Sequence, residues 1–137
     1  MVPESQVMIA VDTNVWVRYV TNDDPVQTER AVKLLGRGDD VFVAKTVLLE
    51  LEWVLRAVYE LPAKAIQRAL LHILGLPSVV VEEPEQIARA LDYYGHGLDF
   101  ADALHLVAAP EDCRLHTFDR KLVKSAAKLG ALVEEVP

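Results

Sequence analysis

Short apolar segments alternate along this chain with longer amphipathic ones. Residues 7–11 are typical of a buried strand, because the segment is short, apolar and ends at a charged residue. The predicted strands are 7–11, 41–44, 78–81, 114–118 and 132–136, and the predicted helices are 13–20, 25–35, 47–59, 62–74, 84–94, 99–109 and 120–129. This alternation predicts an α/β fold of three layers (α/β/α), with a central, mostly parallel sheet of about five strands.

The predicted helix 47–59 has the clearest amphipathic pattern. Thr46 is expected to cap its start, since a threonine side chain can accept a hydrogen bond from a free backbone N–H there. Its apolar face is predicted to consist of Leu48, Leu51, Leu55 and Val58.

Length and composition favour one self-sufficient domain. A chain of 137 residues predicts a single domain over 1–137, and the apolar fraction of 52% is enough to form a core. Cys113 is the single cysteine, so we expect no intrachain disulfide and a cytoplasmic location. Residues 1–6 do not have the pattern of a signal sequence. No segment is long and apolar enough to span a membrane.

The net charge of −7 argues against a protein that coats nucleic acid through bulk electrostatics. The charge is compatible with an enzyme that binds nucleic acid only at a local site. It also suits a partner that carries a basic segment.

Two aspartates follow predicted strands directly. Asp12 comes after the strand 7–11, and Asp119 comes after the strand 114–118. Ligands of open parallel sheets bind at the carboxyl ends of the strands. We therefore expect Asp12 and Asp119 to lie on the same rim.

Four further acids stand on predicted helices. Glu50 interrupts an apolar run, and an alternative interpretation places it at the edge of the apolar face, in water; Glu52 is the more plainly solvent-facing of the two. Asp99 and Asp102 are three residues apart at a helix start, so they share one face. Asp99 is expected to be the N-cap, and Asp102 could simply stabilise the helix dipole.

A cluster of carboxylates could bind divalent metal ions for catalysis. Mg²⁺ and Mn²⁺ are hard cations that prefer oxygen ligands, and they can activate water for attack on a phosphodiester. Carboxylates that lie close together repel one another and raise one another's pKa. Such a cluster is therefore more plausible as a metal site than as a structural feature.

The order of these motifs resembles that of the PIN-domain nucleases and, within them, the VapC-type toxins of toxin–antitoxin pairs. The motifs are Asp12-Thr13-Asn14, Glu50 within residues 48–55, Asp102 within residues 99–105, and Thr117-Phe118-Asp119-Arg120. The resemblance covers nearly the whole chain. It implies an acidic quartet of Asp12, Glu50, Asp102 and Asp119, an additional acid near the metal at Asp99, and supporting residues at Thr13, Asn14 and Thr117.

The same resemblance implies an activity and partners. The expected activity is that of an endoribonuclease that uses one or two Mg²⁺ or Mn²⁺ ions per site and acts on structured RNA. The expected partners are a second copy of the chain, in a homodimer, and a cognate antitoxin whose basic segment enters the acidic site.

Other residues are weaker candidates for substrate binding. His105 shares a helical face with Asp102, but a packing or surface role is the stronger interpretation. Arg18, Arg56 and Arg120 could contact phosphate, and Arg120 is the best of them because it adjoins Asp119. A solvated surface role remains open for each. Trp16 and Trp53 are expected in the core or in a dimer interface rather than as base-stacking residues.

Two other functions compete with the nuclease. A phosphatase with an aspartate nucleophile would need a second aspartate two residues after Asp12, where this chain has Asn14. A non-catalytic binding module that retained the fold is the other alternative.

Overall fold

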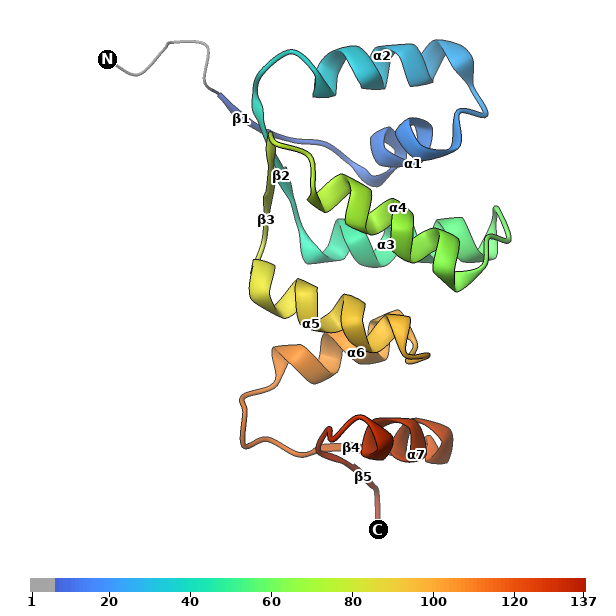
Figure 1. The fold of residues 1–137 in the computed structure, drawn as a ribbon, viewed down its shortest axis with the longest axis vertical. Coiled ribbons are helices and arrows are strands. Elements are labelled where there is room, and N and C mark those ends of the chain that lie inside the picture. Colours follow the sequence, from blue (N-terminus) through green and yellow to red (C-terminus); the bar gives the residue numbers. More distant parts are fainter. Residues whose placement is uncertain (1–6) are drawn as a thin grey trace. The chain divides into compact units, whose positions relative to one another are not determined.

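The computed structural model describes residues 7–137, so the prediction that residues 1–6 form no signal sequence lies outside the described residues. The chain divides into two compact units, the first ending at Glu82 and the second running from Glu83 to Pro137 (Figure 1).

The first unit contains a parallel sheet of three strands. These are β1 (Met8–Ala10), β2 (Asp40–Val43) and β3 (Val79–Val81), in that order across the sheet. Ile9 pairs with Val41, and Val41 in turn pairs with Val79. Val41 and Val43 of the central strand are almost completely buried, as expected where a strand has neighbours on both edges.

Four helices complete the first unit. They are α1 (Thr13–Thr21), α2 (Pro25–Leu35), α3 (Lys45–Ala57) and α4 (Ala63–Leu74). Helix α3 packs against both α1 and α4. The large side chains that become completely buried come mainly from these helices: Trp16, Leu48, Leu51, Leu55, Ile66, Leu70 and Ile73.

The start of α3 differs from the prediction, because Thr46 does not cap it. The N-cap is Ala44, which offers no side-chain hydrogen bond. The backbone N–H of Lys45 instead donates to Oε1 of Glu82, at 2.9 Å. A carboxylate that follows β3 therefore satisfies the helix start, and the helix begins one residue before Thr46.

The far end of α3 also corrects the predicted apolar face. Leu48, Leu51 and Leu55 are buried as expected, but Val58 is 62% exposed. The helix ends at Ala57, so Val58 is the C-cap and no longer continues the buried face.

The second unit contains three helices and a pair of parallel strands. Its elements are α5 (Pro84–Gly95), α6 (Phe100–Ala108), β4 (Leu115–Thr117), α7 (Arg120–Lys128) and β5 (Val133–Glu135). Strands β4 and β5 pair in parallel, with α7 as the crossover between them. A small core of Leu98, Leu122, Ala126 and Val133 holds this unit together.

A tight turn joins α5 to α6. Gly97 has a φ of +102°, a conformation that side chains rarely adopt. The turn brings the rings of Tyr94 and Phe100 into an edge contact, with 5.4 Å between their centroids. This contact helps to fix the start of α6, where two of the candidate acids lie.

The predicted α/β class is confirmed, and all five predicted strands occur. Three of them form the sheet of the first unit and two form the sheet of the second. The single domain over 1–137 stays a prediction. Within residues 7–137, no helix is long and apolar enough to cross a membrane.

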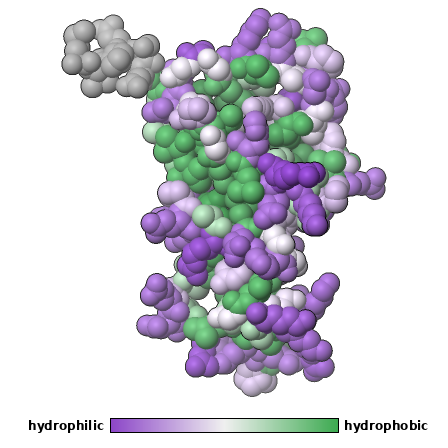
Figure 2. Space-filling model, viewed as in Figure 1, coloured by the Kyte–Doolittle hydropathy of each residue, from purple (hydrophilic) through white to green (hydrophobic). Residues whose placement is uncertain are grey.

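The surface retains several large apolar side chains. Figure 2 shows hydrophobic residues gathered over part of the face in view, with hydrophilic residues around them. Trp16 is fully buried, as predicted for a core residue, but Trp53 is 53% exposed and does not belong to the core. Phe118 is 81% exposed, immediately before Asp119.

Candidate metal-binding site

Asp12 is fixed in place by the helix that it starts. It follows β1 and is the N-cap of α1, where its Oδ1 accepts hydrogen bonds from the backbone N–H groups of Asn14, at 3.0 Å, and Val15, at 3.4 Å. The side chain is exposed. Its Oδ2 forms no hydrogen bond with any residue from 7 to 137, so one carboxylate oxygen holds the helix and the other faces solvent.

The two glutamates of α3 differ in how exposed they are to solvent. Glu50 is exposed and forms no ion pair with a described residue, as the alternative interpretation anticipated. Glu52 is only 2% exposed, and its carboxylate pairs with Arg56 one turn later, at 2.9 Å from Nε. The expectation that Glu52 faces solvent is therefore wrong. The position two residues after Glu50 lies on the packed side of the helix, beside Leu48, Leu51 and Leu55.

Three aspartates of the second unit stand at helix starts. Asp99 is the N-cap of α6, as predicted, and its Oδ1 accepts from the backbone N–H of Asp102, at 3.0 Å. Asp119 is the N-cap of α7, and its Oδ1 accepts from the backbone N–H of Leu122, at 3.1 Å. Asp102 is half-buried in the first turn of α6. All three acids therefore lie at the positive ends of helix dipoles, which favour negative charge.

Burial raises the pKa of the Asp102 carboxyl, and the charges of Asp99 and Asp119 raise it further, while His105 works in the opposite direction. Asp102 therefore lies close enough to Asp99 and to Asp119 for their charges to disfavour its ionised form. None of them forms an ion pair with a residue in the range 7–137. The burial of Asp102 beside two like charges is an unfavourable feature of the folded protein that a bound cation would relieve.

The donor atoms of these acids suit a hard divalent cation. They are carboxylate oxygens only, the ligand type that Mg²⁺ and Mn²⁺ prefer. Within the described part of the chain, no three His, Cys, Asp or Glu side chains form a ready-made metal cluster. Asp12 and Glu50 belong to the first unit, whereas Asp99, Asp102 and Asp119 belong to the second. The shared rim of Asp12 and Asp119 stays a prediction.

The supporting residues have identifiable contacts. The hydroxyl oxygen of Thr117 accepts a hydrogen bond from the backbone N–H of Asp119, at 3.0 Å, which closes the turn between β4 and α7. Thr13 is 5% exposed, directly after Asp12. Asn14 is exposed, and its backbone rather than its side chain contacts Asp12.

The weaker candidates for substrate binding have other contacts. Arg120 is exposed, and its Nε pairs with Glu135 of β5, at 2.9 Å. Arg56 pairs with Glu52. His105 is exposed on the last turn of α6 and acts on Asp102 through its charge. His116, which the sequence placed in the strand, lies beside Glu134, with 3.4 Å between Nε2 and Oε2.

A comparison with protein families identifies the chain's relatives. The PIN domain family matches residues 9–128, which include every candidate acid. The chain belongs to the PIN domain family. No curated protein and no solved structure matches it. Membership of the PIN domain family indicates a nuclease of the metal-dependent class, a hydrolase of phosphodiester bonds, which agrees with the all-oxygen donor set.

Sequence reasoning missed one group of polar residues in the PIN domain's first unit. Gln27 and Arg30 of α2 face α1 and, with Arg18, line a pocket. Of these lining residues, the sequence indicated Arg18 alone as a candidate phosphate contact. The available signal was the spacing of Gln27, Arg30, Ala31 and Leu34, which places them along one side of the helix.

Proposed function

We propose that this PIN domain is an endoribonuclease that uses Mg²⁺ or Mn²⁺ and acts as the toxin of a toxin–antitoxin pair in the cytoplasm. The observation that carries the proposal is the placement of Asp99, Asp102 and Asp119 at the starts of α6 and α7 without an ion pair to any described residue, where burial first, and then the charges of Asp99 and Asp119, raise the pKa of Asp102. Uncompensated carboxylates at helix starts are the arrangement expected of a cation site.

The proposed ligands of one or two ions are Asp12, Glu50, Asp102 and Asp119, with Asp99 as an additional acid. When bound, such an ion supplies Lewis-acid activation of water and neutralises charge that develops on the phosphodiester. The protein's own part is to hold the carboxylates in position. The N-cap hydrogen bonds fix the Oδ1 atoms of Asp12, Asp99 and Asp119.

The net charge of −7 supports the proposed partner. An antitoxin with a basic segment would find an exposed carboxylate at Asp119 and a half-buried one at Asp102. A Lys or Arg side chain placed there would relieve the same repulsion as a metal ion, and so would inhibit by competing for the site. A homodimer is part of the proposal and rests on the resemblance alone.

The decisive experiment is cleavage of total RNA by the full chain, with Mn²⁺, with Mg²⁺ and with a chelator, and with the new ends mapped by sequencing. We expect cleavage at internal positions with either metal and none with chelator. Asp12→Asn and Asp102→Asn should each lose most of the activity. Asp112→Asn is the matched control, because Asp112 is exposed in a turn of the second unit, and it should cleave like the wild type.

Other outcomes would contradict the proposal. Full activity of Asp102→Asn would remove that residue from the site. RNA binding without cleavage in any metal would favour the binding module. Cleavage of DNA but not of RNA would leave a metal-dependent nuclease and exclude the proposed substrate.

A further inference from the structure

A pocket of about 400 Å³ opens between α1 and α2 in the first unit. Its volume lies within the usual range of small-ligand pockets, roughly 300–1,000 Å³. Its polar lining consists of Asn14, Arg18, Gln27 and Arg30. Val15, Ala31 and Leu34 supply the apolar part.

The lining has only one sign of charge. Two arginines and two residues with side-chain amides line the pocket, and none of its lining residues is acidic. Asp23 and Asp24 lie near Arg18 outside the lining, so the positive charge of the pocket that no described carboxylate pairs is that of Arg30. Guanidinium groups present planar donors that match phosphate oxygens.

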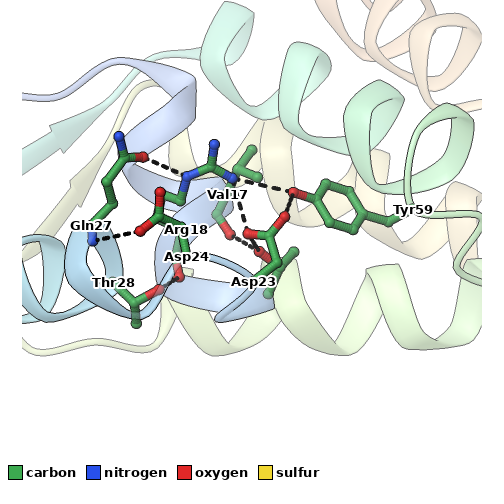
Figure 3. Close-up of polar contacts among 8 residues, drawn as sticks. Val17, Arg18, Asp23, Asp24, Gln27, Thr28 and Tyr59 are labelled. Atoms are coloured by element: carbon green, nitrogen blue, oxygen red, sulfur yellow. Dashed lines mark hydrogen bonds and ion pairs between the residues drawn. The ribbon is translucent and has the colours of Figure 1, made fainter.

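Arg18 is held in a fixed orientation, as Figure 3 shows. Its Nε donates to Oε1 of Gln27 at 2.6 Å, and one terminal nitrogen donates to Asp23 at 3.0 Å and to the Tyr59 hydroxyl at 3.3 Å. The other terminal nitrogen forms no hydrogen bond with a described residue, so its donors remain available. An arginine held in this way loses little conformational entropy when it binds an anion.

Arg30 is exposed and forms no hydrogen bond or ion pair with any residue from 7 to 137. Its charge is therefore fully available to a ligand, whereas that of Arg18 is partly compensated by Asp23. The pocket also lies close to a proposed metal ligand of the same unit. Asn14 lines it, and the backbone N–H of Asn14 donates to Asp12 at 3.0 Å.

We propose that this pocket binds one nucleotide of the RNA strand, next to the residue that holds the cleaved phosphodiester. The phosphate would lie against Arg18 and Arg30, and the base or ribose against Val15, Ala31 and Leu34. The proposal rests on the proposed ribonuclease function and adds a subsite to it. A basic antitoxin segment is disfavoured as the occupant, because it would meet charge of its own sign.

The test measures RNA binding separately from cleavage. Asp12→Asn is prepared in the full chain and titrated, with chelator present, into a fluorescein-labelled single-stranded RNA decamer of mixed sequence. Adding Arg30→Ala should weaken binding by about 5- to 10-fold and reduce the slope of log affinity against log salt by about 0.7, the loss of one phosphate contact. Arg68→Ala is the matched control, an exposed arginine of α4 outside the pocket, and should change neither value.

A second measurement locates the ligand. In ¹⁵N spectra of the full chain, a nucleoside monophosphate should shift the side-chain amide signals of Asn14 and Gln27, and inorganic phosphate should shift them less. Unchanged binding in Arg30→Ala, or an equal loss in Arg68→Ala, would overturn the proposal. Weaker binding of an acidic peptide, but not of RNA, in Arg30→Ala would also overturn it, in favour of a partner protein with an acidic segment.

The nucleotide subsite and the ribonuclease can fail separately. If the wild type cleaves RNA with Mn²⁺ and Arg30→Ala binds normally, the subsite alone is wrong. If the wild type cleaves no RNA in any metal, the ribonuclease is wrong, whatever the pocket binds.

Discussion

Removing Arg56 should destabilise the protein, because this side chain compensates a carboxylate that is almost inaccessible to water. Glu52 is 2% exposed and Arg56 is 50% exposed, with Nε and Oε2 at 2.9 Å and a second contact of 3.4 Å. Breaking a fully buried ion pair by removing one partner costs roughly 3–5 kcal/mol. Since half of Arg56 is in water, we expect Arg56→Ala to cost about 2–3 kcal/mol.

The assay is urea unfolding of the full chain, followed by circular dichroism, with a thermal melt as a second measure. For a chain of this length, that loss corresponds to a fall in Tm of roughly 6–12 °C. Arg68→Ala is the control, and it should remain within about 0.5 kcal/mol of the wild type. Glu52→Leu should be far less harmful than Arg56→Ala, because it removes the buried charge and leaves an arginine that water can reach.

The outcome that refutes this reasoning is a free energy of unfolding for Arg56→Ala equal to that of Arg68→Ala. Glu52 would then be stabilised without its partner on the next turn. A Glu52→Leu protein less stable than Arg56→Ala would be an equally clear contradiction. It would mean that the carboxylate, rather than its compensation, contributes to the fold.

Three further predictions concern the site and the network around Arg18. Glu50→Gln should lose most metal-dependent RNA cleavage yet unfold in urea within about 0.5 kcal/mol of the wild type, because an exposed carboxylate contributes little to stability; a normal cleavage rate would remove Glu50 from the site. The raised pKa of Asp102 means that the folded state holds that proton more tightly, so the ionised carboxyl lowers stability once the pH has risen through its folded pKa. With chelator present, Asp102→Asn should therefore gain stability relative to the wild type between pH 4 and pH 7, as measured by urea midpoints, and a constant difference would contradict the assignment. The hydrogen bond from Tyr59 lowers the pKa of Asp23 and so stabilises the fold above the ordinary carboxyl pKa, with the effect lost as the pH falls through the folded value. Tyr59→Phe should accordingly have a lower Tm at pH 7, and the deficit should shrink toward pH 3; a deficit independent of pH would show that the hydroxyl acts through its other hydrogen bond, to Arg18, and not through the charge of Asp23.

The sequence predicted the order and type of the elements well, since local signals determine them. Helix α2 begins at Pro25 after the Asp24 cap and ends at Leu35 before Gly36, which are the bounds predicted from the sequence. The predicted N-cap role of Asp99 is also confirmed. These features depend on neighbours within about four residues, which the sequence displays directly.

The sequence predictions failed where a residue far away in the sequence determines the local structure. Thr46 looked like a cap, but Glu82, 37 residues later, satisfies the N–H of Lys45 and moves the helix start. Glu52 looked solvent-facing, yet burial is set by what packs on that side of α3, and Arg56 makes the buried charge tolerable. The pocket lined by Arg18 and Arg30 depends likewise on how α1 packs against α2. The periodicity of a single sequence does not show which helices pack against each other or which distant side chains meet.

The N-cap role of these acids also determines how the site must be tested. In Asp12, Asp99 and Asp119, one oxygen accepts a backbone N–H at a helix start, and the other forms no hydrogen bond with a described residue. Alanine at such a position removes a cap worth about 1 kcal/mol together with the charge. Asparagine keeps the capping oxygen and removes only the charge, since it caps helices as well as aspartate does. A loss of activity in an asparagine variant of normal stability therefore reports on the carboxylate itself, whereas the same loss in an alanine variant would leave a displaced helix as a sufficient explanation.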